Sequence, residues 1–162
     1  MGKVHVVEHA DPVKRTFRLE LAGKIDEDAI LPELPAKGSN FDRVVVDLGD
    51  VTYINSCGVR TWIGWVNAFP KGLHVEYERC PVVMVHQMSL ISGFLPNGSL
   101  VRSFNVPYYC AACDRSETVL YVEGRHFHGT EVHPKDQNCP GCGKPMAIDI
   151  MEGMYFKFLS RR

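Results

Sequence analysis

Residues 44–62 read VVVDLGDVTYINSCGVRTW, and this stretch decides the fold. Its three consecutive valines at 44–46 are typical of a strand in a sheet that is covered on both faces. A short polar turn, NSCG at 55–58, comes next, and apolar residues with helical spacing follow it directly. Helix amides point out of such a turn, so residues 55–58 are the first place to look for chemistry. The apolar stripe of the helix consists of Val59, Trp62, Ile63, Val66 and Phe69.

The segments around this unit predict several more strands. The alternating apolar residues of TFRLELAG (16–23) indicate a half-buried strand, and HVVEH (5–9) is its expected hairpin partner across a turn at 10–15. Patterns of the same kind and one valine-rich run predict the remaining strands. These are FDRVVVDL (41–48), LHVEYE (73–78) and SLVRSFNV (99–106).

Helices are expected between these strands. The segment GKIDEDAILPEL (23–34) predicts a short helix, with Asp26 as its N-cap, acidic residues in its first turn and Pro32 near its end. Pro81 can occupy the first turn of a third helix over 82–95. The alternation of strands and helices predicts an α/β fold with a mixed, largely parallel sheet.

The pattern changes near residue 106. The remaining residues form short strand-like runs that are separated by turn residues and by paired cysteines. We therefore predict two domains, an α/β domain over 1–105 and a small β module over 106–162.

Four of the six cysteines form two closely spaced pairs in this second part. Cys110 and Cys113 make one C-x2-C motif, Cys139 and Cys142 make another, and 25 residues separate the two motifs. Each motif places two sulfurs on one side of a tight turn, and two such turns complete the tetrahedral ligand set of Zn²⁺. With four cysteine ligands the ion would be structural, because a catalytic zinc keeps one position open.

A pair of redox-active C-x-x-C motifs is the alternative interpretation. A thioredoxin-like motif comes once and opens a helix after a strand, whereas these motifs come twice in a segment rich in turns. Pro140, Gly141 and Gly143 favour a tight turn, and CPGCGKPM (139–146) resembles the knuckle of a zinc ribbon. We therefore predict one structural Zn²⁺ site.

The charge balance argues against a nucleic-acid binder. The chain has a formal charge of −1, residues 1–105 carry 11 basic and 12 acidic side chains, and residues 106–162 carry 7 of each. Neither part has the basic excess of a nucleic-acid-binding domain, and four thiolates on zinc would add a local charge of about −2. In the second part we interpret four aromatic residues as core residues or protein contacts (Tyr108, Tyr109, Tyr155, Phe156). We interpret three histidines as surface residues (His126, His128, His133).

The sequence also carries an expectation about location. The N-terminal stretch MGKVHVVEHADPVKRTF lacks the long apolar core of a signal peptide. Apolar runs elsewhere fall short of the roughly 20 residues that a membrane-spanning helix needs. We expect a cytoplasmic protein without direct membrane insertion.

The segments LAGKIDEDA (21–29) and FDRVVVDLGDVTYINSCGVRTW (41–62), with the two strand-helix units after them, match a known pattern. Residues 3–105 resemble a STAS domain, the fold of anti-sigma-factor antagonists and of the cytoplasmic part of sulphate transporters. In that family an L-x-G-x-[IL]-D segment precedes the first helix, and a hydrophobic strand leads through D-S-[ST]-G into the second. The zinc-ribbon tail takes the place of the last helix of the family.

The resemblance implies a regulatory module that binds a protein partner through the surface around the turn. The partner would be a kinase-like anti-sigma factor or, as in some members, a transporter subunit. In the family a serine or threonine immediately before the glycine, or one place earlier, accepts phosphate, and the added charge of about −1.5 to −2 breaks the complex. Asp26 matches the acid beside the family's site, and Gly58 matches its glycine.

The sequence departs from the family at the turn itself. Asn55 replaces the acid, Ser56 keeps the first hydroxyl position, and Cys57 stands at the second. Cys57 has three open interpretations: a packed small residue, an activated thiol at a helix N-terminus, or a bystander beside a phosphoacceptor Ser56. Asn55 and Ser56 are also candidate N-caps. Trp65 lies on the flank of the helix, where it can contact a partner or belong to a second buried face.

We therefore expect a non-enzymatic regulatory protein that binds its partner through Asp26, residues 55–58 and Trp65. No nucleophile–base–acid set is evident in the sequence near the turn. Three alternatives stay open: a thiol-based redox sensor or enzyme at Cys57, a nucleic-acid-binding regulator that uses the ribbon, and a STAS subunit of a membrane transporter complex.

Overall fold

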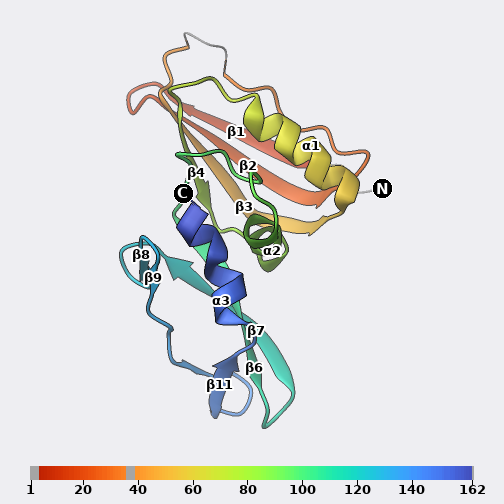
Figure 1. Ribbon diagram of the computed structural model, residues 1–162, viewed down its shortest axis with the longest axis vertical. Coiled ribbons are helices and arrows are strands. Elements are labelled where there is room, and N and C mark those ends of the chain that lie inside the picture. The colour runs from red at the N-terminus through yellow and green to blue at the C-terminus, as the bar shows by residue number, and fades with distance from the viewer. Residues whose placement is uncertain (1–3, 36–38, 162) are drawn as a thin grey trace.

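The computed structural model describes residues 4–35 and 39–161, which form a mixed α/β layer followed by a cysteine-rich β module (Figure 1). Within these ranges no helix combines the length and apolar character that crossing a membrane requires. The elements of the first part are β1 (His5–Asp11), β2 (Thr16–Ile25), β3 (Arg43–Ile54), α1 (Ser56–Asn67), β4 (His74–Glu78), α2 (Val82–Leu90) and β5 (Leu100–Val101). Those of the second part are β6 (Ser103–Cys110), β7 (Arg115–Val122), β8 (Phe127–His128), β9 (Glu131–Val132), β10 (Gln137–Asn138), β11 (Pro145–Ile148), α3 (Glu152–Tyr155) and the 3₁₀ helix Phe156–Arg161.

The first sheet has the strand order β1-β2-β3-β4-β5. β1 pairs antiparallel with β2, and the other three pairings are parallel. The hairpin turn is closed where the amide of Lys14 donates to the carboxylate of Asp11 and Arg15 takes a φ of 52°. The predicted N-terminal hairpin and the mixed α/β fold with a partly parallel sheet are confirmed.

One face of this sheet is apolar and packs against the helices. Leu19, Val46 and Tyr77 are neighbours across β2, β3 and β4, and all three are fully buried. Trp62 of α1 lies over this face, with its ring centroid 6.0 Å from that of Tyr77. Its indole N–H donates to the carbonyl of Phe94 at 3.0 Å. The predicted apolar stripe of α1 therefore faces the core, and Figure 1 shows the helix running alongside the strands of the sheet.

The opposite face of the sheet is held by ion pairs. Arg18 of β2 binds the carboxylate of Asp47 on β3, which is almost fully buried. The guanidinium of Arg79 reaches the same carboxylate at 2.9 Å. Arg18 also lies beside Val45 in the strand register, so its stem shields the one valine of the run that lies on this face. The valines are buried as expected, but on this face the cover is made of charged side chains.

A second ion cluster continues this face toward the β module. Glu76 of β4 is buried, and its carboxylate accepts hydrogen bonds from Arg43 at 2.5 Å and from Arg102 at 2.9 Å. Arg102 also binds Glu123, which follows β7. The buried carboxylate is therefore satisfied on both sides, and Arg102 links the two sheets.

The expected helix over 23–34 is not formed. Residues 23–25 belong to β2, residues 26–28 make a turn in which the carboxylate of Asp26 accepts the amide of Asp28 at 3.2 Å, and an irregular segment follows. Pro32 has no amide to donate within a helix, and its carbonyl accepts the indole N–H of Trp65 at 2.8 Å. A tertiary contact thus holds a segment whose local signals favoured a helix.

Two further boundaries differ from the prediction. α2 ends at Leu90 instead of continuing over 82–95, and Gly93 takes a φ of 84° in the loop that follows. Such a conformation favours glycine and interrupts a helix. The strand expected over 99–106 divides at Arg102 into β5 and β6, because the chain changes sheet there.

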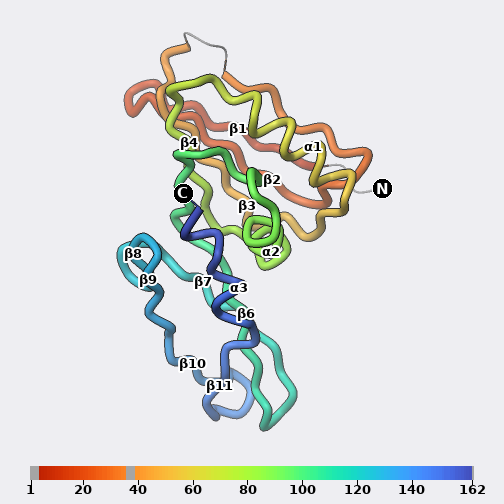
Figure 2. The backbone as a smooth tube through the Cα atoms, in the orientation of Figure 1, coloured from red at the N-terminus to blue at the C-terminus, as the bar shows by residue number. Residues whose placement is uncertain are grey.

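β6 connects the two parts of the molecule. Near its start, Phe104 forms a parallel bridge with Cys80, and the amide of Asn105 donates to the carbonyl of Cys80 at 2.8 Å. The whole strand pairs antiparallel with β7 in a sheet of order β10-β11-β6-β7 (Figure 2). The boundary proposed at residue 106 therefore falls inside a continuous strand.

The C-terminal helical segment returns to the α/β part. The hydroxyl of Ser89 on α2 donates to the carbonyl of Tyr155 at 2.6 Å, and the hydroxyl of Tyr155 donates to the carbonyl of Asn105 at 2.5 Å. Phe158 and Leu159 are buried in the same hydrophobic cluster as the sheet residues. The two parts consequently share one core.

Replacing Glu76 with glutamine is expected to weaken the acid dependence of stability. Burial by itself would raise the pKa of Glu76, but hydrogen bonds from Arg102 and Arg43 outweigh it and hold this pKa below its usual range. The carboxylate therefore stabilises the fold above its unfolded pKa of about 4.3, and this contribution is lost as pH falls through the folded pKa. We expect Glu76→Gln to cost about 2 kcal/mol at pH 7 and less at about pH 3.

Urea titrations of both proteins between about pH 5 and pH 3 measure this difference. Glu33→Gln is the matched control, because Glu33 is exposed. All three proteins contain the same cysteine cluster, so the comparison between them isolates the carboxylate. Parallel stability curves for Glu76→Gln and the unaltered chain would contradict the prediction.

Candidate functional site

Asn55 fixes the turn between β3 and α1. Its side-chain oxygen accepts the amide of Gly58 at 2.8 Å, and its backbone carbonyl accepts the amide of Val59 at 2.8 Å. Asn55 is therefore the N-cap of α1, which confirms one of its sequence interpretations. Its side-chain nitrogen donates to the carboxylate of Glu27 at 2.7 Å, and this hydrogen bond lowers the pKa of Glu27. The cap thus ties the helix start to the segment that follows β2.

Gly58 allows the start of α1 to lie directly against the end of β2. A Cβ atom on Gly58 would lie 1.8 Å from the carbonyl oxygen of Ile25 and 3.1 Å from the amide nitrogen of Asp26. The amide of Asn55 donates to the same Ile25 carbonyl at 3.3 Å. Only a residue without a side chain fits this approach. The structure therefore brings Asp26, Asn55 and Gly58 together.

Ser56 and Cys57 open α1, and both side chains are exposed. The interpretation of Cys57 as a packed small residue is wrong, because Gly58 makes the close contact with β2 while Cys57 faces solvent. An accessible thiol and a bystander beside Ser56 are the two interpretations that this geometry leaves. The turn therefore presents one hydroxyl and one thiol side by side on a fixed scaffold.

Three consecutive acids, at 26–28, lie beside the turn. Glu27 contacts the turn directly through Asn55, and sequence reasoning did not assign it to the site. The run DED after a strand was the signal that could have found it. A phosphate on Ser56 would be favoured by the N-terminus of α1 and opposed by these carboxylates. A phosphate at this position would therefore meet two opposing electrostatic effects.

Trp65 lies farther along α1 and has a structural contact. Its indole N–H is bound to Pro32, and its ring lies 5.3 Å from that of Trp62 and 5.0 Å from that of Phe69. The side chain is half-buried. Trp65 therefore anchors the irregular segment after β2, and its contact with a partner stays a prediction.

The sulfur atoms of the two C-x2-C motifs all lie within 4.8 Å of one another. The sulfurs of Cys110 and Cys142 are 3.6 Å apart, and those of Cys113 and Cys139 are 3.4 Å apart. A disulfide requires about 2.05 Å. Four sulfurs placed about 2.3 Å from a central ion would be about 3.8 Å apart at the corners of a tetrahedron. The cluster can therefore hold one metal ion, as the spacing predicted.

Both motifs lie on tight turns. Cys110 is the last residue of β6, and the turn after it is closed by Asp114 with a φ of 55°. In the second turn the amide of Gly143 donates to the carbonyl of Cys139 at 2.8 Å, and that of Gly141 donates to its sulfur at 3.4 Å. Gly143 takes a φ of 73°, which favours glycine. Local chain geometry thus turns the sulfurs toward one another.

The thiols also affect one another's protonation. Burial opposes ionisation of Cys139, but the amides of Cys142 and Gly141 outweigh it and lower the pKa of Cys139 to about 7. The neighbouring thiol of Cys139 is the main cause that raises the pKa of Cys113 to about 12. A divalent cation offsets these unfavourable effects on ionisation, because it binds all four groups as thiolates. Metal binding at the cluster therefore displaces protons.

The histidines and tyrosines of the β module are not part of the cysteine cluster. The Nδ1 atom of His126 accepts the amide of Val122 at 3.0 Å, and His128 and His133 are exposed. Among the described residues the metal-ligating group consists of the four cysteines. Tyr108 and Tyr155 are buried, which fits their interpretation as core residues.

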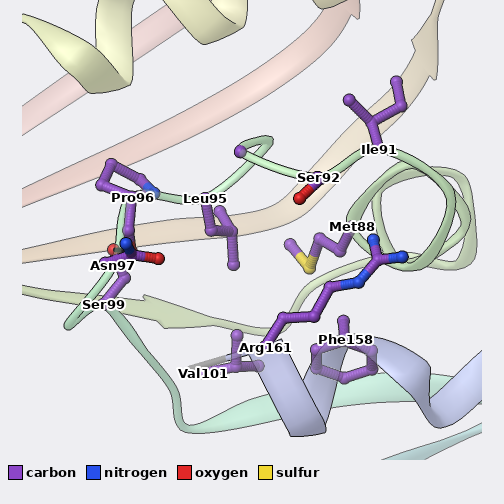
Figure 3. A pocket seen from close by; sticks show the side chains of 11 residues that line it. Met88, Ile91, Ser92, Leu95, Pro96, Asn97, Ser99, Val101, Phe158 and Arg161 are labelled. Carbon is purple, nitrogen blue, oxygen red and sulfur yellow. Dashed lines mark hydrogen bonds between the residues drawn. The ribbon is translucent and has the colours of Figure 1, made fainter.

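A small pocket lies where α2 meets the C-terminal segment (Figure 3). Met88 and Phe158 form its apolar wall, and the side chain of Arg161 extends beside both. Its volume of about 60 Å³ leaves room for about two water molecules. The Nη1 atom of Arg161 is buried and has no hydrogen-bond partner in the part of the chain that the structure describes. The pocket is far smaller than a typical ligand site.

Replacing Gly58 with alanine is expected to destabilise the fold by about 2–4 kcal/mol, because the new Cβ would overlap the Ile25 carbonyl. Gly64→Ala on the same helix is the control. A Cβ at Gly64 meets nothing within 4 Å, so this change should stabilise the helix by about 0.5–1 kcal/mol. Urea unfolding measures both values. Equal effects of the two substitutions would refute the close contact.

The chain is expected to bind one Zn²⁺ through the cysteine cluster. Serine at any of the four positions should abolish stoichiometric binding, whereas Cys57→Ser should leave one ion per chain, because Cys57 lies outside the cluster. Removal of the metal should lower the melting temperature by at least about 10 °C, since metal binding is coupled to folding. Metal analysis and thermal unfolding with and without a chelator test this. A chain that melts identically in both states would contradict it.

Comparisons with known proteins leave the family of the chain open. A scan against protein-family models found no match. Searches among curated proteins and among solved structures also found none. The chemistry of the β3–α1 turn and of the cysteine cluster is therefore the basis for inferring function.

Proposed function

We propose that this chain is a non-enzymatic regulatory protein whose STAS-like domain binds a protein partner through the β3–α1 turn. The observation that carries the proposal is the exposure of Ser56 and Cys57 on a turn held by Asn55 and Gly58. The partner would be a kinase-like anti-sigma factor or a transporter subunit, as the resemblance of residues 3–105 implies. A rigid turn with exposed side chains suits recognition, because little conformational entropy is lost on binding.

The turn also suits regulation by a change of charge. Phosphate on Ser56 would add about −1.5 to −2 charge beside the carboxylates at 26–28. An interface formed on this surface would then contain uncompensated negative charge and would weaken. Asn55 is compatible with such a switch, because it keeps the capping hydrogen bond to Gly58 without adding another carboxylate to the turn. Ser56 is therefore the proposed switch residue.

The exposure of Cys57 favours a second candidate, a thiol switch at the same turn. Oxidation or modification of an exposed thiol changes the size and polarity of the surface without disturbing the core. Cys57→Ser separates the two candidates, because it removes the thiol and keeps a side chain of similar size. A partner complex that loses its sensitivity to oxidant in Cys57→Ser would support the thiol switch.

The cysteine cluster has a supporting role in this proposal. We assign it one structural Zn²⁺, because four thiolates leave no open coordination position for a substrate. The ion would stabilise the module whose C-terminal segment packs on α2 through Ser89 and Tyr155. The zinc site thereby supports the domain that carries the turn.

The proposal predicts that partner binding depends on the turn. Partners are captured from native cells with the metal-loaded chain and identified by mass spectrometry, and the same capture is made with a Ser56→Asp, Cys57→Asp variant. A specific partner should be reduced at least about tenfold by the variant, because two carboxylates enter the interface. A Ser116→Asp, Thr118→Asp variant is the matched control, since both residues are exposed on β7.

If both variants retain the same partners, the turn is not part of the interface. Loss of a partner from the β7 control alone would transfer the interface to the β module. The measured zinc content and melting temperature of each variant show that the comparison is made between folded chains.

A further inference from the structure

An apolar groove lies between α2 and α3, and its lining shares no residue with the β3–α1 turn or the cysteine cluster. Its volume is about 190 Å³, and α2 and α3 lie side by side in Figure 1. Three large apolar side chains on it remain well exposed: Leu90 at 65%, Met151 at 73% and Met154 at 54%. The groove is lined by His86, Ser89, Leu90, Asp149, Ile150, Met151, Met154 and Tyr155.

The groove has a fixed floor. Tyr155, the last residue of α3, is almost fully buried, with its carbonyl bound to Ser89 of α2 and its hydroxyl bound to Asn105. The ring of His86 meets the ring of Tyr155 edge-on at 5.3 Å. Met151 and Met154 therefore lie beside a ring that hydrogen bonds hold in place, and their flexible thioether side chains can adapt to the shape of a bound apolar surface.

The charge of the groove has one sign. Asp149 is the carboxylate among its lining residues, and Glu152 begins α3 next to Met151. Both acids are exposed, and neither forms an ion pair within the described residues. An occupant with an apolar surface and flanking basic groups would complement both properties.

We propose that this groove binds an amphipathic helix of a partner protein, with apolar residues against Leu90, Met151 and Met154 and with lysine or arginine beside Asp149 and Glu152. Binding of a helix by its apolar face in a groove is an established recognition mode, with anchors at i, i+3, i+4 and i+7. Exposed methionine and leucine side chains suit such an occupant, because methionine adapts its shape to an apolar surface. This surface is separate from the turn, so the inference does not rest on the proposed function.

The groove also depends on the cysteine cluster. β11 follows the second cysteine turn, and only residues 149–151 separate its last residue, Ile148, from α3. Loss of the metal should release the turn that leads into β11 and hence the position of α3. Helix binding should therefore require the metal-loaded chain.

The probe is a fluorescein-labelled peptide of about 18 residues made of leucine and lysine, with the leucines along one helical face. Its matched partner has glutamate in place of every lysine. Fluorescence anisotropy with the full, zinc-loaded chain measures both affinities at low and at physiological salt. The lysine peptide should bind, the glutamate peptide should bind at least about tenfold more weakly, and salt should reduce the difference.

A first set of substitutions locates the site without changing net charge, and a second set reverses the charge beside it. A Leu90→Gln, Met154→Gln variant should weaken binding of the lysine peptide at least about tenfold, because both anchors are lost. A Val13→Gln, Ile30→Gln variant is the matched control, since these residues are 92% and 77% exposed elsewhere on the surface. Asp149→Lys with Glu152→Lys should reverse the preference between the two peptides. Glu33→Lys, an exposed acid on another segment, should leave the preference unchanged.

Each outcome decides the inference. Equal loss in the groove and control variants, equal binding of both peptides, or no binding by the unaltered chain would overturn it. A chain that forms a dimer in solution which Met154→Gln dissociates would also overturn it, because the occupant would then be a second copy. Unchanged peptide binding in the Ser56→Asp, Cys57→Asp variant is expected, so failure here is distinguishable from failure of the turn as a partner site.

Discussion

The rest of the structure depends on the continuity of β6. Its start is fixed to the α/β part by the bridge between Cys80 and Phe104, and its last residue, Cys110, supplies a sulfur to the metal-ligating cluster. These two ends are six residues apart, which is about 20 Å of extended chain. β6 is paired with β7 along its whole length, so the position of Cys110 is fixed relative to the α/β part. The core and the cysteine cluster are therefore parts of one mechanical unit, which the C-terminal segment closes through Tyr155 and α2.

The two proposed binding surfaces use this rigidity in different ways. The β3–α1 turn presents Ser56 and Cys57 on a helix start that the contact between Gly58 and Ile25 holds against the sheet. Recognition there would be sensitive to charge, because small polar groups stand beside carboxylates. The groove between α2 and α3 instead offers adaptable apolar side chains on a fixed floor. The two proposed surfaces thus differ in kind: binding at the turn would respond to a change of charge, and binding in the groove would tolerate partners of different shape.

The charged face of the sheet has a different physical role. Asp47 and Glu76 are removed from water, and arginines on neighbouring strands or just after a strand satisfy their oxygens. Buried ion pairs contribute little net stability, because desolvation offsets most of their attraction, yet breaking one leaves a costly unpaired charge. Their effect is to select one strand register, since a slip of one residue would move these carboxylates to the apolar face.

The sequence by itself determined the features that depend on neighbouring residues. The two cysteine turns and the N-terminal hairpin are each closed within a few residues, so their spacing and composition were sufficient. For the cap of α1 the sequence left Asn55 and Ser56 open, and the structure selects Asn55. The residues of the turn were also found from the pattern, except Glu27, whose role depends on a side chain 28 positions away.

Tertiary structure alone decided the features that depend on distant partners. The segment after β2 has local helix signals, but the bond between Trp65 and Pro32 spans 33 residues and holds it irregular. The groove exists because Ser89 and Tyr155, 66 residues apart, bring α2 and α3 together. Such contacts leave no periodic trace in the sequence, because their free energy comes from groups that become neighbours only when the chain has folded.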